Sequence, residues 1–73
     1  MEYLTVNIYE HMSINYTYIV WNKDVLLGEI VEDDIMKLLN KEQIIDFYHR
    51  DKHKFKVLVS DLNTLLDKPV SND

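Results

Sequence analysis

The histidines have the widest chemical range of any side chain in this sequence, because an imidazole can bind a metal ion or act as a general base. His49 and His53 are four residues apart, the spacing that places two ligands on one helix face. No glutamate follows His49 as in the zincin motif, and the cations Arg50, Lys52 and Lys54 surround the pair. Because these cations would repel a metal ion, we expect exposed histidines and no metal site.

The hydroxyl and carboxylate side chains form no catalytic pattern. Ser13 and Ser60 lack the flanking glycines of a nucleophile elbow, and the single glycine of the chain cannot build a phosphate-binding loop. The adjacent Asp33 and Asp34 would point in different directions on a helix, so they make a poor acid–base pair. We therefore expect a protein that is not an enzyme and needs no cofactor.

Charged residues are separated along the chain. Residues 24–36 contain no basic residue, and their acidic patch consists of Glu29, Glu32, Asp33 and Asp34. This patch could contact a basic groove on a partner, or it could serve only as a well-charged helix start. Residues 49–56 carry a formal charge of +3, which could contact nucleic-acid phosphates or keep an edge strand soluble.

Aromatic residues are concentrated near the N-terminus, at Tyr3, Tyr9, Tyr16, Tyr18 and Trp21. Odd and even positions both carry them, so some must lie on the sheet face opposite the core. Tyrosine and tryptophan often anchor protein interfaces, and they also pack across strands in ordinary sheets. The pattern predicts partner docking or self-association, for which a homodimer is the commonest closed form.

Alternating and β-branched runs predict a sheet. Tyr3–Met12 alternates with a period of two, Tyr16–Trp21 is aromatic and β-branched, and Val25–Ile30 follows a polar turn at residues 22–24. These three strands should form an antiparallel meander. Gly28 inside the third strand indicates a bulge or a close backbone approach.

The second half of the chain predicts helices and at least one more strand. Three carboxylates favour a helix start at residue 32, with an end near Asn40. Residues 55–59 predict a strand, and Ser60 is the expected N-cap of a last helix over residues 61–68. Residues 43–50 fit either a helix or a strand that feeds a hairpin. The expected class is α+β: a small, mainly antiparallel sheet, made of a three-strand meander plus a further strand or hairpin, with two short helices.

An internal similarity bears on the ambiguous segment. Residues 34–41 and 61–68 both read acid, aliphatic, two variable residues, Leu-Leu, small polar residue, Lys. A true duplication would repeat a hairpin–helix unit and favour a strand at residues 43–50. Chance agreement between two short amphipathic helices would leave the segment undecided.

Length and composition set outer bounds. The 73 residues allow one domain over residues 1–73, with residues 69–73 as a frayed tail. The start Met1-Glu2-Tyr3 lacks the basic region of a signal peptide, and the apolar runs are too short to span a bilayer, so we expect a cytoplasmic protein without membrane contact. A net charge of −5 disfavours direct nucleic-acid binding. It favours a protein that binds a protein, or one that competes with nucleic acid for a basic surface.

A short peptide and the overall composition of the chain resemble those of a known protein family. Gln43-Ile44-Ile45-Asp46-Phe47 resembles the glutamine–hydrophobic–phenylalanine peptide that binds the pocket of bacterial sliding clamps, with Asp46 where a leucine is expected. Lys, Asn, Ile, Tyr and Asp make up 33 of 73 residues, as an AT-rich coding sequence would produce. In length, character and its opening residues 1–6, the whole chain is similar to the sliding-clamp inhibitors of Twort-type staphylococcal phages, which belong to the small host-takeover proteins of phages.

The resemblance implies a phage protein that binds the sliding clamp of the bacterial DNA polymerase in the host cytoplasm. It would occupy the DNA channel or the peptide pocket of the clamp, and so block DNA loading and replication. The candidate protein-binding residues are Glu29, Glu32, Asp33, Asp34, Gln43, Phe47 and Tyr48. Three alternatives stay open: a DNA-mimic inhibitor of another host nucleic-acid-binding protein, a small nucleic-acid-binding regulator that uses residues 49–56, and an assembly component.

Overall fold

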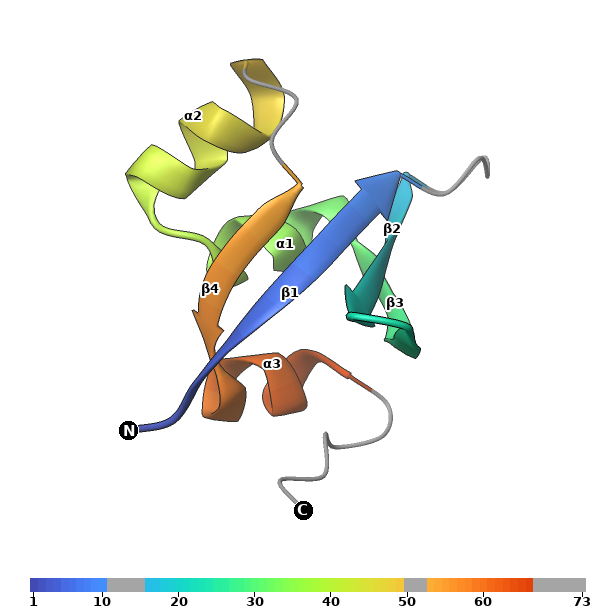
Figure 1. Cartoon of the computed structure of the whole chain (residues 1–73). Helices are drawn as coiled ribbons and strands as arrows, with labels where there is room; N and C mark the ends of the chain where they lie inside the picture. The colour runs from blue at the N-terminus through green and yellow to red at the C-terminus, as the bar shows by residue number, and fades with distance from the viewer. Residues whose placement is uncertain (11–15, 50–52, 67–73) are drawn as a thin grey trace.

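A four-stranded antiparallel sheet in the order β3-β2-β1-β4 organises the chain (Figure 1). The computed structural model describes residues 1–10, 16–49 and 53–66. The strands are β1 (Tyr3–Glu10), β2 (Thr17–Asn22), β3 (Val25–Val31) and β4 (Lys54–Leu58). The helices are α1 (Glu32–Leu38), α2 (Lys41–His49) and α3 (Val59–Leu65). The predicted α+β class, the three-strand meander and the additional strand are therefore confirmed.

The described helices pack on one face of the sheet, because alternate strand residues are apolar on that face. In β1, Val6 and Ile8 are fully buried, and their antiparallel neighbours Val20 in β2 and Phe55 in β4 are buried too. In Figure 1, β1 passes in front of α1, so the view looks onto the opposite face, which we call the open face. The sheet thus separates a helix-covered side from an open side.

The core lies between the sheet and the helices. Ile35 from α1 and Leu62 from α3 are fully buried in a cluster that includes strand residues from all four strands. Burying one such aliphatic side chain is worth about 1.5–3 kcal/mol. The other members of the cluster are Val6, Ile8, Val20, Ile30, Leu38, Leu39, Phe55, Val57 and Leu66.

The helices correct three expectations. The sequence allowed either a helix or a strand at residues 43–50. The structure has a helix at Lys41–His49, so the strand alternative is wrong. The described chain therefore has three helices, where two were expected. The last helix begins at Val59, with Leu58 as an N-cap that makes no side-chain bond, so Ser60 is not the cap. The Val59 N–H instead donates to the Glu2 carbonyl over 3.0 Å, which continues the β1–β4 ladder into the helix. The expected tail, residues 69–73, lies outside the described residues.

The internal similarity has a structural counterpart in the strand–helix units. The helices Glu32–Leu38 and Val59–Leu65 each follow a strand directly and are displaced from each other by 27 positions. Each ends at an extended residue, Leu39 or Leu66, whose N–H donates to the carbonyl four residues earlier. The element before each unit differs, since β2 precedes one and α2 the other. Only the strand–helix step is repeated, and the second hairpin that a true duplication would require is replaced by α2.

Both the backbone conformation and the neighbouring side chain require a glycine at position 28. Val20 pairs with Gly28 whereas Trp21 pairs with Leu26, so one extra residue bulges from β3. The φ angle of Gly28 is +156°, and a Cβ there would lie 3.0 Å from Leu66 Cδ2. The expectation of a bulge and a close approach at Gly28 is confirmed, and the approach brings the end of α3 under β3.

We expect the change Gly28→Ala to destabilise the protein by about 1–3 kcal/mol, because alanine would adopt a strained φ and displace Leu66. The matched control is Val25→Ala in the same strand, where the side chain is 60% exposed and the change should stay within about 0.5 kcal/mol. Urea unfolding of both variants measures the difference. Equal stabilities of Gly28→Ala and the wild type would contradict this account of β3.

Candidate functional site

The acidic patch is divided between two surfaces of the molecule. Glu32, Asp33 and Asp34 form the first turn of α1, on the helix side, where carboxylates favour the positive end of the helix. Glu29 pairs with Ile19 in the sheet, on the open face. Because β3 is an edge strand and α1 follows it directly, Glu29 and the three carboxylates of α1 are close only at this edge of the sheet.

Glu32 is held by a tyrosine from the next helix. Its carboxylate accepts a short hydrogen bond from the Tyr48 hydroxyl, which also lies 3.9 Å from Met36 Sδ. This hydrogen bond, followed by burial, raises the pKa of Tyr48 to about 12. The contact orients α2 against α1, and it places two of the sequence-predicted residues together.

Asp33 and Asp34 have different surroundings. Asp33 is exposed, whereas Asp34 is partly covered and forms an ion pair with Lys37 over 3.4 Å. Such an exposed pair within one helix contributes only a few tenths of a kcal/mol. Both carboxylates are therefore available for long-range attraction to a basic surface. Within the described part of the chain, no group of three or more acidic or histidine side chains could hold a metal ion.

Gln43 is engaged in the fold by three hydrogen bonds. Its Oε1 accepts from the Asn40 N–H and its own N–H donates to Asn40 Oδ1, each over 2.9 Å, which is the reciprocal capping box at a helix start. Its Nε2 donates to the Lys56 carbonyl over 2.9 Å. Gln43 thus caps α2 and ties it to the edge of β4.

The Phe47 ring is half-buried and packs against other aromatic rings. It makes edge-to-face contacts with Tyr18, Tyr48 and Phe55 at centroid distances of 5.0, 5.3 and 5.9 Å. Burial, with smaller effects of Glu32 and Glu10, raises the pKa of Tyr18 above its usual value. The structure therefore brings Phe47 and Tyr48 together with Glu32, but as a packed helix interface.

A sequence signal for this arrangement was available. Asn40 followed three residues later by Gln43 is a capping-box pattern, and it predicts a helix beginning at residue 41. The similarity to a clamp-binding peptide drew attention to Gln43 as a binding residue instead. The capping-box pattern therefore favours the helix over the strand for residues 43–50.

His53 directly precedes β4 and lies beside β1. His53 Nδ1 is 3.2 Å from the Ile8 carbonyl oxygen, and its ring stacks on Tyr9 at 4.8 Å. His49 is the exposed last residue of α2. Lys54 and Lys56 are exposed in β4; the other two cations of this segment, at positions 50 and 52, lie outside the described residues.

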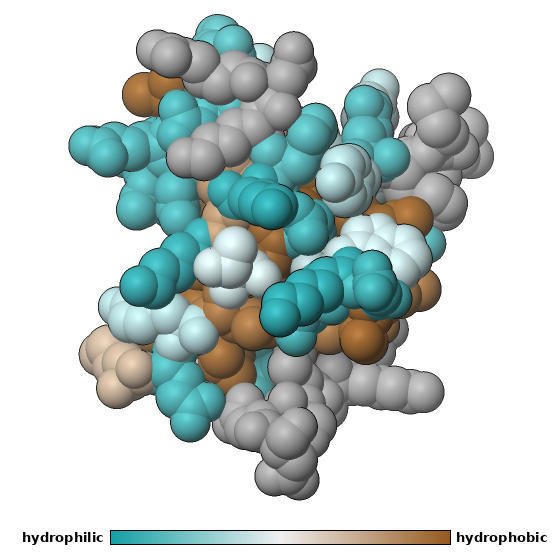
Figure 2. All heavy atoms as spheres, in the orientation of Figure 1, coloured by the Kyte–Doolittle hydropathy of each residue, from teal (hydrophilic) through white to brown (hydrophobic). Residues whose placement is uncertain are grey.

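The open face carries aromatic and apolar side chains between polar ones (Figure 2). Tyr3 and Tyr9 are 52% and 45% exposed, and Lys56 Nζ lies 5.2 Å from the centre of the Tyr3 ring. Ile19 and Trp21 in β2 are half-buried on this face. The expectation that some aromatic residues lie opposite the core is confirmed for these strands.

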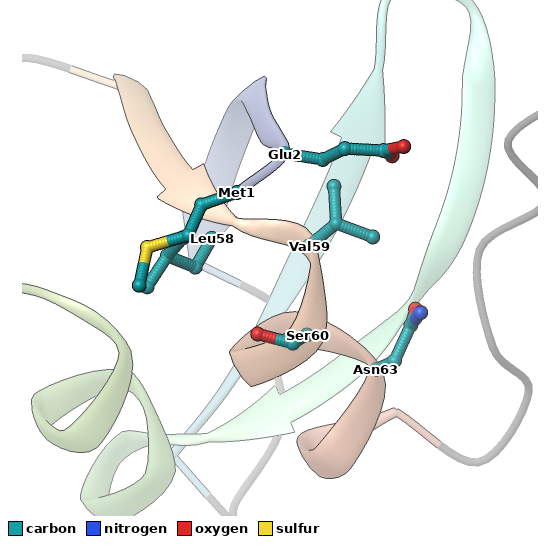
Figure 3. Close-up of a pocket in the computed structure, with 6 residues that line it drawn as sticks. All are labelled: Met1, Glu2, Leu58, Val59, Ser60 and Asn63. Atoms are coloured by element: carbon teal, nitrogen blue, oxygen red, sulfur yellow. The ribbon is translucent and has the colours of Figure 1, made fainter.

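A shallow hollow of about 350 Å³ lies where the N-terminus meets α3 (Figure 3). Its lining includes the polar residues Ser60, Glu2 and Asn63. In Figure 3 the Ser60 hydroxyl points toward Met1, whereas the Glu2 carboxylate points away to the other side. This geometry provides no paired nucleophile and base.

Comparisons with known proteins found no matching family model, no matching curated protein and no matching solved structure. Among the described residues, no helix is long and apolar enough to cross a membrane.

We expect Gln43→Ala to lower the free energy of unfolding by about 1–2 kcal/mol, because both the helix cap and the bond to Lys56 are lost. Gln43→Glu is the informative partner variant, since a carboxylate still accepts from the Asn40 N–H and cannot donate to the Lys56 carbonyl. Its loss should be smaller than that of Gln43→Ala. Denaturant titration of both variants tests this; a wild-type stability for Gln43→Ala would show that these bonds do not hold α2.

Proposed function

We propose that the protein is a non-enzymatic protein-binding inhibitor that docks its acidic α1 surface on the basic surface with which a partner holds DNA. The first candidate partner is the sliding clamp of the bacterial DNA polymerase, and the protein would act as a phage product in the host cytoplasm. By occupying the DNA channel of the clamp, it would block DNA loading and replication.

The observation that carries the proposal is the acidic first turn of α1. Its three carboxylates lie on the helix side, and Asp33 is exposed there. A ring that encloses DNA presents positive charge to the phosphates, so an acidic ligand is attracted to the same surface. The net charge of −5 supports the same preference over the whole molecule.

The contacts of Gln43 and Phe47 favour the acidic surface over the peptide-like segment. To enter a pocket on the clamp, Gln43 would have to give up its bonds to Asn40 and Lys56. Phe47 would have to leave its packing against Tyr18 and Phe55. Exposing a packed aromatic ring and breaking a helix cap together cost several kcal/mol. The proposal therefore assigns these two residues to the fold, and docking to the acidic turn.

The test is the double variant Asp33→Asn/Asp34→Asn, which leaves the Glu32–Tyr48 contact in place. Exposed charges act mainly on the association rate, and salt screens them over a Debye length of about 8 Å at physiological ionic strength. We expect association with the purified clamp to slow several-fold at low salt and less at high salt. Surface plasmon resonance at two ionic strengths measures both rates.

The matched control is Glu42→Gln/Asp61→Asn. It removes two exposed first-turn carboxylates from α2 and α3, and it changes the net charge by the same amount. Its association rate should change less than that of the Asp33/Asp34 variant. Equal effects of the two double variants would show that only net charge matters. An unchanged rate in the Asp33/Asp34 variant at low salt would overturn the proposal.

A further inference from the structure

We infer that the open face of the sheet is the interface of a two-fold symmetric dimer of this chain. The inference goes beyond the proposed function and does not depend on it, because the docking surface on α1 lies on the other side of the sheet. It rests on the arrangement of charge and apolar surface over the four strands.

The two edges of the open face carry opposite charges. Glu29 stands on the β3 edge, where it pairs with Ile19. Lys54 and Lys56 stand on the β4 edge, where they pair with Asn7 and Thr5. Since strands in a sheet are about 4.8 Å apart, the two edges are separated by roughly 14 Å.

The middle of the face is apolar and aromatic. Tyr9 and Ile19 lie opposite each other on β1 and β2, and Trp21 lies between Asn7 and Leu26 in the next row of the sheet. Leu26 is 53% exposed, although it is a large aliphatic residue. The described helices all pack on the other face, so none of them covers these side chains.

A second copy fits this pattern by symmetry. Two sheets that pack face to face with a two-fold axis parallel to the strands place β3 of one copy over β4 of the other, and β1 over β2. Glu29 of one copy then lies about 7 Å along the strand and about 10 Å across the two sheets from Lys54 of the other, a separation that the two side chains span together. The same contact forms twice. Tyr9 of one copy then lies over Ile19 of the other, and Asn7 lies over Trp21.

The area of the open face indicates how tightly the dimer should form. Four strands of five to eight residues give a projected area of roughly 400 Å². A surface covered by side chains has a larger accessible area than its projection, so the face approaches the roughly 600 Å² that each partner contributes to the smallest stable interfaces. We therefore expect a dimer that forms at micromolar concentration.

The experiment is a charge exchange between the two edges. Glu29→Lys places a lysine near Lys54 of the other copy, and Lys54→Glu places a carboxylate near Glu29 of the other copy, so each variant alone should dimerise at least tenfold more weakly than the wild type. An equimolar mixture restores attraction at both contacts, and it should form a heterodimer with near wild-type affinity. Sedimentation equilibrium of each variant and of the mixture measures this, with thermal unfolding as a check on folding.

Glu42→Lys and Lys41→Glu are matched controls, because they make the same charge changes on exposed positions of α2. They should leave the dimer unchanged. A wild-type protein that sediments only as an 8.8 kDa species at 100 μM (about a hundredfold above the expected midpoint) would overturn the inference. So would a dimer that the exchanges at positions 29 and 54 do not weaken, or a monomer that binds an oligonucleotide through Lys54.

Discussion

The structure depends on the burial of one face of one sheet. Residues on alternate positions of β1 supply fully buried Val6 and Ile8, and the described helices pack against that face through Ile35 and Leu62. Each helix is only seven to nine residues long, which is too short for stability in isolation. Their stability comes from this contact, and the opposite face of the sheet consequently keeps half-buried residues such as Ile19 and Trp21.

This one-sided burial separates two surfaces that have different chemistry. The helix side carries the carboxylates of α1, with Glu32 bound to Tyr48 and Asp33 exposed. The open side carries an apolar centre between Glu29 and Lys54. The two proposed contacts, with a basic partner and with a second copy of the chain, are therefore compatible, because neither uses the residues of the other.

Local pattern predicted most of the fold, because strand periodicity follows directly from burial on one face. Alternation over β1 and the β-branched run of β2 located both strands, and Gly28 indicated the bulge in β3. The segment at residues 43–50 was ambiguous because Ile44, Ile45, Phe47 and Tyr48 contain both helical and strand spacings. The choice depends on the cap formed by Asn40 and Gln43, and on the contact of Phe47 with residues distant in sequence.

The candidate site was harder to predict than the fold. Glu29 is close to Glu32 in the sequence, but the pleat of β3 turns Glu29 toward the open face while α1 begins on the other side. Gln43 and Phe47 matched a binding peptide in their letters, yet the fold uses both for capping and packing. Charge and motif patterns in a sequence do not specify the face on which a residue lies, and that face determines which surface it can serve.

The most direct test of the account is the fluorescence of Trp21, the one tryptophan in the sequence, which lies near the middle of the open face. If a second copy covers this face, the emission maximum should shift to shorter wavelength and acrylamide quenching should fall as the protein concentration rises. Both changes should follow the mass measured by sedimentation, with the same midpoint. A mass that doubles while the emission and quenching of Trp21 stay constant would contradict the account.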